Sequence, residues 1–513
     1  MARGLSSVRE PIDRLVGNWL PFTSSRSSKR GKGTAMRASV TDPQPLRARL
    51  GQRHMSMIAI GGVIGAGLFV GSGSAIHSAG PGVILAYIAV GGLVILMMRM
   101  LAELAVASPE TGSFASYATR EIGPWAGLAV GWIYAYMWCV TVGFEATAAA
   151  AIAHRTVPGV PPWLAALTFM IVLTALNLIT VRAFGEVEFW FASIKVFTIV
   201  AFLALGAVAL LGWFPGRPAP GLTNLLHNGG FLPHGFTAVL LAVLAIVFSF
   251  FGTEVVTVAA GEARNPRAAV RSAMRSVVAR ILIFYIGSVT VIVMLLPTSS
   301  SDVTESPFVA VLDHLGIPLA AQVMDVVVLT AVLSCLNSGI YACSRMLYSL
   351  AGRGEAPRIA MRTDRRGVPV LAVLLASLGG FVTVIANYFL PTATVFTFLL
   401  ESTGALALVV YIGIAVTQYR GRTRLRRERA EQALQVRMWG FPYLTWVVLS
   451  LLGTILVALV LIPDSRRSTS LSLAVTAIAA TGGLLHGRRI RRAVPSPSSG
   501  HLPGGEKVRQ DDH

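Results

Sequence analysis

The sequence predicts an all-helical protein that crosses a membrane many times, and three observations support this prediction. Hydrophobic residues make up 54% of the 513 positions, charged residues only 13%, and the mean hydropathy is +0.67. Apolar runs of about 20 residues, long enough to cross about 30 Å of hydrocarbon, recur from residue 55 to residue 487. Glycine and polar residues interrupt two of these runs near mid-depth. Strands of a membrane barrel would instead alternate over about ten residues.

Twelve apolar runs predict twelve spans. They cover residues 55–77, 82–105, 124–154, 162–182, 188–212, 234–260, 276–297, 320–351, 368–389, 393–418, 441–463 and 468–487. With a cytoplasmic N-terminus, the inner loops hold 18 Lys and Arg residues and the outer loops hold four. This asymmetry predicts a membrane protein with both termini in the cytoplasm. The net charge of +19 therefore reflects topology and contact with anionic lipid, not nucleic-acid binding.

The domain organisation follows from the same pattern. Residues 1–53 are expected to form a disordered basic cytoplasmic arm, and residues 488–513 a disordered cytoplasmic tail. The transporter domain between them spans residues 54–487. Its first and sixth spans lie five spans apart, an odd number, so two repeats of inverted topology are expected at about 54–212 and 234–418. Extra helices follow within residues 441–487.

The first interruption is the heptapeptide GGVIGAG at residues 61–67. Interior glycines weaken a helix, and unwound backbone at membrane depth is tolerated where it lines a cavity and a ligand satisfies it. A half-helix is expected over residues 68–76. The N–H groups of Gly65, Ala66 and Gly67 lie at its start and are expected to bind a substrate carboxylate. The Val63 carbonyl is a candidate acceptor for an ammonium. Close helix packing through small residues is the alternative.

The second interruption is Ser249–Glu254 in the sixth span. Gly252 would break the helical ladder there, leave room for a ligand and release the carbonyls of Phe248 and Phe251 to accept from an ammonium. Glu254 is an ionisable group inside a span. It either contacts the substrate or holds N–H groups at the start of a half-helix.

Four further charged residues within spans are candidates for a functional or structural role. Lys195 is the only lysine in any span; it either extends to the inner interface or faces the bundle and carries a proton. Arg99 and Glu103 are four residues apart and are expected to pair on one helix face. Glu145 has no local partner and is a candidate for lining the cavity.

Enzyme chemistry is not expected. The three cysteines all lie inside predicted spans, which predicts neither a disulfide framework nor a metal site. Phosphate-loop, zinc and nucleophile motifs are absent from the sequence. We therefore expect no cofactor and no metal.

Several stretches resemble the amino-acid permeases of the amino acid–polyamine–organocation superfamily. They are RHMSMIAIGGVIGAGLFVGS (53–72), AGP (79–81), EIGPW (121–125), EARNP (262–266) and SCLNSGIYACSRML (334–347). Within this superfamily the chain is most similar to γ-aminobutyrate permeases, through MRMLAELAVASPETGSF (98–114), EA (145–146), VPGVP (157–161) and YLTW (443–446). Gly67 departs from the serine that some of those permeases have.

The resemblance implies a LeuT-like fold of two inverted five-helix repeats plus two extra helices. It also implies proton-coupled uptake of an amino acid, with γ-aminobutyrate (GABA) favoured. The substrate carboxylate would bind the first interruption and the ammonium the carbonyls of Val63, Phe248 and Phe251. Lys195 matches the position of the second sodium ion in sodium-coupled relatives. Permeases or exchangers for other amino acids, and an amino-acid sensor that does not transport, are the alternatives.

Overall fold

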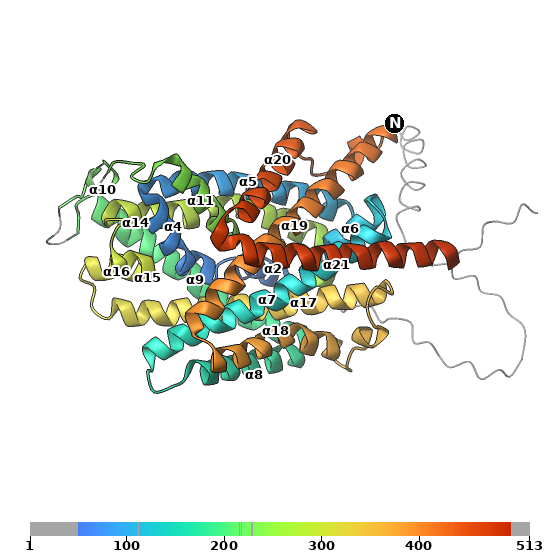
Figure 1. Ribbon diagram of the computed structural model, residues 1–513, viewed down its shortest axis with the longest axis horizontal. Helices are drawn as coiled ribbons and strands as arrows, with labels where there is room; N and C mark the ends of the chain where they lie inside the picture. The colour runs from blue at the N-terminus through green and yellow to red at the C-terminus, as the bar shows by residue number, and fades with distance from the viewer. Residues whose placement is uncertain (1–49, 111, 215, 217, 227–228, 494–513) are drawn as a thin grey trace, which may run out of the picture.

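The protein is a bundle of long helices. The computed structural model describes residues 50–110, 112–214, 216, 218–226 and 229–493. The predicted arm up to residue 49 and the predicted tail from residue 494 lie outside this range. Within it the chain is helical, and its one isolated β-bridge joins Leu50 to Ala263. Most long helices run along the long axis of the molecule (Figure 1).

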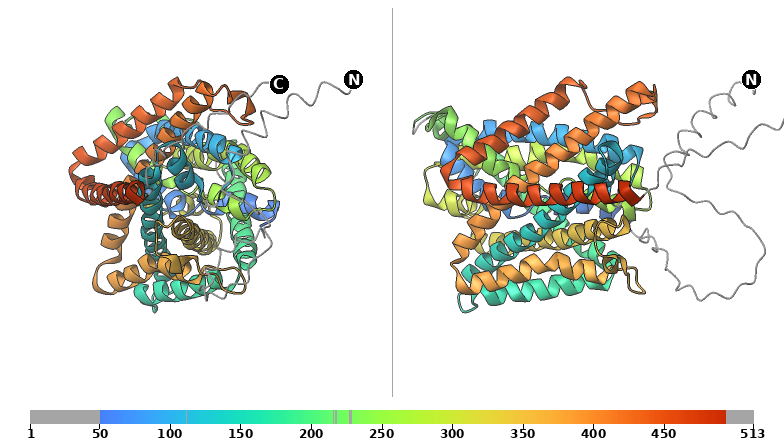
Figure 2. Two further views of the ribbon diagram at one scale, coloured as in Figure 1. Left: turned by 90° about the vertical axis from the view of Figure 1, so that its right-hand side faces the viewer. Right: turned by 45° about the vertical axis from the view of Figure 1, so that its right-hand side comes forward.

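The predicted spans correspond to helices of two kinds. Nine helical segments in the described part are long and apolar enough to cross a membrane. The continuous helices are α5 (Val83–Ala107), α7 (Pro124–Thr156), α8 (Pro162–Ile179), α9 (Val181–Leu210), α17 (Ala320–Gly352), α18 (Val370–Phe389), α19 (Thr392–Arg427), α20 (Tyr443–Leu461) and α21 (Pro463–Ala493). The helices α20 and α21 lie on the outside of the bundle (Figure 2).

The first, sixth and seventh predicted spans consist of shorter pieces. The first comprises α2 (Gln52–Gly61), α3 (Ala66–Phe69) and α4 (Gly71–Ala79); the sixth comprises α11 (Gly235–Ser249) and α12 (Val255–Ala259). The seventh comprises α13 (Pro266–Arg280), the π-helix η3 (Ile281–Gly287) and α14 (Ser288–Leu295). Both predicted interruptions are therefore present in the fold.

The remaining elements are short connections. They are the helices α6 (Ser113–Glu121), α10 (Thr223–Leu226), α15 (Ser301–Glu305) and α16 (Pro307–His314), and the 3₁₀ turns η1 (Gly80–Gly82), η2 (Ala260–Glu262), η4 (Arg358–Met361) and η5 (Glu431–Ala433). In Figure 1, α10, α15 and α16 lie at one end of the bundle and α6 lies toward the other.

Two predicted boundaries are wrong. The half-helix expected over residues 68–76 begins earlier, at Ala66, and is itself interrupted at Val70 between α3 and α4. The predicted disordered tail begins too early, because residues 488–493 continue α21 to Ala493, although the apolar span itself ends at Gly487 as predicted. Charged residues continue that helix past the apolar run, which hydropathy alone does not reveal.

The two interrupted spans are tied together at one end by backbone hydrogen bonds. Leu50, just before α2, donates its N–H to the Glu262 carbonyl (3.2 Å) and accepts from the N–H of Arg264 (3.1 Å). The Glu262 carboxylate then reaches α17, where it accepts from Arg345 Nε (2.8 Å) and the Tyr341 hydroxyl (3.1 Å). The side chains of Arg345 and Glu262 are almost completely buried. This buried ion pair connects the chain after the second interruption to α17.

Breaking this ion pair is expected to destabilise the fold strongly. Replacing Arg345 with Ala leaves the Glu262 carboxylate buried without its charge partner, a change that typically costs about 3–5 kcal/mol. The exposed pair between Arg155 and Asp325 provides the control. Arg155→Ala should cost no more than about 1 kcal/mol. Unfolding of the purified protein in detergent measures both, and equal losses would contradict the expectation.

Candidate substrate site

The two interruptions lie against each other. A Cβ atom added to Gly252, whose φ is +99°, would overlap the Gly62 carbonyl oxygen. The Ser249 hydroxyl donates to the Gly67 carbonyl (2.9 Å). The Tyr285 hydroxyl lies within hydrogen-bond distance of the carbonyls of Val63 (3.3 Å) and Ser249 (2.9 Å). Some of the carbonyl groups that the interruptions leave without a helical partner thus accept hydrogen bonds from the other span or from the π-helix η3.

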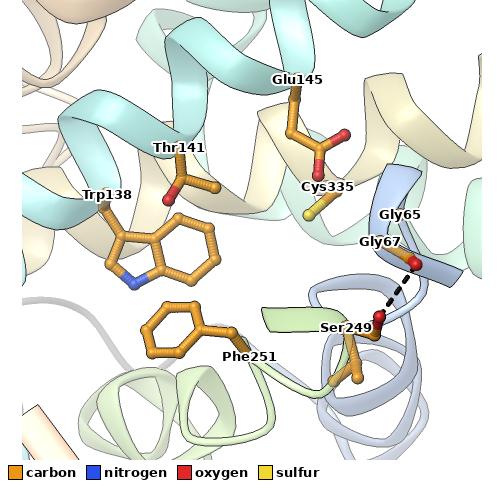
Figure 3. A pocket seen from close by; sticks show the side chains of 9 residues that line it. Gly65, Gly67, Trp138, Thr141, Glu145, Ser249, Phe251 and Cys335 are labelled. Carbon is orange, nitrogen blue, oxygen red and sulfur yellow. Dashed lines mark hydrogen bonds between the residues drawn. The ribbon is translucent and has the colours of Figure 1, made fainter. Parts of the chain in front are cut away.

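A small cavity lies beside these interruptions. Its lining comes from both interruptions and from the helices α7 and α17: Val63, Gly65, Gly67, Trp138, Thr141, Glu145, Ser249, Phe251 and Cys335. Figure 3 shows Glu145 and Cys335 on the side of Gly65 and Gly67, with Trp138, Thr141 and Phe251 farther along the cavity. One end of the cavity is therefore polar and the other aromatic.

The aromatic end is built by packed rings. The ring centroids of Trp138 and Phe251 lie 5.5 Å apart, and Phe251 in turn lies 5.8 Å from Tyr411. Phe248, another residue of the predicted site, lies near the end of α11. Aromatic faces attract cations, so this end of the cavity suits an ammonium group.

The polar end contains a buried carboxylate. Glu145 is 2% exposed, and its Oε2 lies 3.5 Å from the backbone nitrogen of Ala66, which donates to it. A Cβ atom added to Gly65 would lie 2.8 Å from Glu145 Oε1 and 2.9 Å from Cys335 Cβ. The absence of a side chain at Gly65 is what allows the carboxylate to approach the interrupted backbone.

Lys195 lies inside the bundle and not at the lipid interface. Its side chain is completely buried, and it interacts electrostatically with Glu188, Cys335 and Glu145. The alternative in which it extends to the inner interface is therefore wrong. Burial also places its charge among the groups that line the cavity.

Sequence reasoning missed Glu188. This residue of α9 is fully buried and accepts from the Ser334 hydroxyl (2.6 Å) and from Asn337 Nδ2 (3.2 Å). It lies about two helical turns before Lys195 and so on the same helix face. This spacing could have identified Glu188 from the sequence, since a lysine and a glutamate on one face of an apolar span are expected to interact.

Glu254 lies at the second interruption. Its Oε2 accepts from the N–H of Gly252 (3.1 Å) and its Oε1 accepts from the Tyr134 hydroxyl (3.3 Å). The side chain is fully buried and is not among the residues that line the cavity. This geometry favours the structural alternative, in which the carboxylate holds the interrupted backbone in place.

The expected pair between Arg99 and Glu103 does not form. Glu103 instead accepts from Arg422 (2.8 Å) and Gln418 (3.0 Å), both on α19. Arg99 donates to the Arg437 carbonyl (2.9 Å) and lies over the Trp439 ring. Tertiary partners with better geometry compete successfully with the local i,i+4 contact. Arg99 and Glu103 therefore connect α5 to the segment around α19, away from the cavity.

Comparison with known proteins identifies the class of this helical bundle. The amino acid permease family model matches residues 54–492. The chain belongs to this family. It is therefore a multi-pass membrane protein of the amino acid permease family, and relatives of this chain are named permeases.

Three relatives illustrate the similarity of this permease to characterised family members. It is 49% identical to the gamma-aminobutyric acid permease of Bacillus subtilis over 444 residues, which cover 86% of this chain and 94% of the relative. It is 47% identical to the gamma-aminobutyric acid permease of Escherichia coli over 83% of this chain and 91% of the relative. It is 42% identical to an aromatic amino acid transport protein of Corynebacterium glutamicum, over 82% and 91% respectively.

Proposed function

We propose that this permease imports GABA together with a proton across the plasma membrane, with both termini in the cytoplasm. The main support is the 49% identity to a permease named for GABA, which extends over 94% of that relative. Identity to the aromatic amino acid transport protein is lower, at 42%. The excess of Lys and Arg in the predicted inner loops supports the orientation.

The cavity suits a zwitterion in one orientation. The carboxylate binds the backbone N–H groups of Gly65, Ala66 and Gly67, which we call the carboxylate site. The ammonium lies toward the carbonyls of Val63, Phe248 and Phe251 and the aromatic end of the cavity. Gly252 keeps the two interruptions close enough for one small ligand to contact both.

Lys195 takes up and releases the transported proton. It is completely buried beside the cavity and interacts with two carboxylates, Glu188 and Glu145. Glu254, Glu103 and Arg99 hold the surrounding helices in place. The transport cycle requires no cofactor and no metal in this proposal.

Uptake of labelled GABA into proteoliposomes tests the proposal. We expect uptake that an inward proton gradient drives to accumulation, and we expect strong competition by unlabelled GABA but weak competition by proline, alanine, asparagine and aromatic amino acids. An α-amino acid that competes better than GABA would refute the substrate assignment. Uptake that requires amino acid inside the vesicles and ignores the proton gradient would instead favour an exchanger.

Filling the space at Gly65 is expected to remove uptake while leaving the protein in the membrane. The added side chain of Gly65→Val would meet Glu145 and Cys335 at contact distances that real Cβ atoms do not adopt. GABA uptake should fall by at least about 100-fold, a loss of about 3 kcal/mol of binding energy. Gly92→Val is the control, because Gly92 of α5 has open space around it. Wild-type uptake by the Gly65 variant would contradict the placement of the carboxylate site.

A further inference from the structure

We propose that Glu145 is a switch that admits the substrate carboxylate to the cavity only when Lys195 carries a proton. This inference rests on the proposed function and adds the physical link between the substrate and the proton. Glu145 lines the cavity, and the proposed function alone gives it no role.

The first observation is that Glu145 occupies the carboxylate site. Its Oε2 accepts from the Ala66 N–H (3.5 Å), one of the groups expected to bind the substrate carboxylate. Glu145 and the Gly65–Gly67 turn line the same cavity, as Figure 3 shows. Two ionised carboxylates repel each other strongly in a water-poor site. The substrate carboxylate can therefore bind there only after Glu145 leaves.

The second observation is that the cavity wall has binding capacity for a ligand. The Trp138 side chain is completely buried and lines the cavity. Its ring packs against that of Phe251, with 5.5 Å between the centroids, and Thr141 adds a hydroxyl group to the same part of the lining. Aromatic faces attract cations, so this end of the cavity attracts the ammonium of a zwitterion whose carboxylate points toward Gly65.

The third observation is that Lys195 interacts electrostatically with Glu145. The charged and titratable groups that face these two residues in the described part of the chain are Glu188 from the same helix as Lys195 and Cys335 from α17. Glu188 accepts hydrogen bonds from Ser334 and Asn337. Glu145 has only the long contact with the Ala66 N–H (3.5 Å) and the Cys335 thiol, a weak donor, so it is the more easily displaced of the two carboxylates.

These observations define a cycle. A proton from outside binds Lys195 Nζ, and the resulting ammonium draws the Glu145 carboxylate away from Ala66 by charge attraction. The substrate carboxylate then binds the vacated site. On the cytoplasmic side the proton leaves Lys195, Glu145 returns to Ala66, and its charge expels the substrate carboxylate. One proton and one substrate have moved in the same direction.

Equilibrium binding of labelled GABA to purified protein between about pH 5 and pH 8 tests the switch. Because the substrate binds the form with one additional proton, wild-type affinity should rise as pH falls, by up to about tenfold per pH unit. Glu145→Ala leaves the carboxylate site permanently vacant. Its affinity should be at least as high as that of wild type at low pH and should change by less than about twofold over the same range.

Three variants and one control make the outcome decisive. Glu145→Gln keeps the size of the side chain but not its charge, and Lys195→Arg keeps a positive charge at every pH; both should remove most of the pH dependence. Glu103→Gln removes a buried carboxylate outside the cavity and should retain the wild-type pH dependence.

Three results would overturn the switch. They are wild-type affinity that does not change with pH, Glu145 or Lys195 variants that keep the wild-type pH dependence, and folded Glu145 variants that bind no GABA at any pH. The last result would make Glu145 a direct ligand of the substrate. If wild type binds another amino acid and not GABA, the substrate assignment under the proposed function is wrong. The same variants, measured with that amino acid, then still test whether Glu145 acts as the switch.

Discussion

Replacing Lys195 with Met is expected to abolish accumulation of GABA against a concentration gradient. A gradient of one pH unit supplies about 1.4 kcal/mol and can drive about tenfold accumulation through a one-proton symporter. Methionine fills a similar volume but binds no proton, so the inside-to-outside ratio of GABA should not rise above about one. Proteoliposomes with an internal pH one unit above the external pH measure this ratio directly.

The matched control for Lys195 is another cation on the same helix. Arg182 lies near the start of α9 and its side chain is exposed. Arg182→Met therefore removes one positive charge without changing the buried cluster, and we expect it to accumulate GABA as wild type does. Accumulation by the Lys195 variant with an unchanged dependence on pH would rule out Lys195 as the proton carrier.

Local backbone signals in the sequence predict the two interruptions well. A cluster of glycines within an apolar run has few explanations, because each interior glycine weakens the helix and hydrocarbon cannot satisfy the opened backbone. Gly252 adopts φ +99°, a conformation that side chains other than glycine rarely allow. The positions of the interruptions could therefore be predicted without tertiary information, although the exact start of α3 could not.

Contacts between distant parts of the chain could not be predicted in this way. The bond between Ala66 and Glu145 joins residues 79 positions apart, and the bond between Glu103 and Arg422 joins residues 319 positions apart. Spacing along one helix suggested the wrong partner for Glu103, because a local pair and a tertiary pair compete and only packing decides between them. A single sequence does not show which of two competing partners a charged residue contacts in the fold.

Gly252→Ala is expected to abolish transport. The residue has φ +99°, and holding a residue with a side chain there costs about 1–3 kcal/mol. The added Cβ would also overlap the Gly62 carbonyl oxygen. The backbone fixes the position of a Cβ atom, and the Gly62 oxygen is itself a backbone atom. No change of rotamer therefore relieves the overlap, and the two interrupted spans must separate.

Separation of these spans would disturb several bonds at once. The Ser249 hydroxyl would move from the Gly67 carbonyl, and Tyr285 could no longer reach the carbonyls of both Val63 and Ser249. GABA uptake should fall below detection, and the unfolding temperature should decrease. Gly453→Ala in α20, where the glycine has open space around it, should change neither. Wild-type uptake by the Gly252 variant would mean that transport does not need the contact between the interruptions, and the substrate could then not be held by both of them.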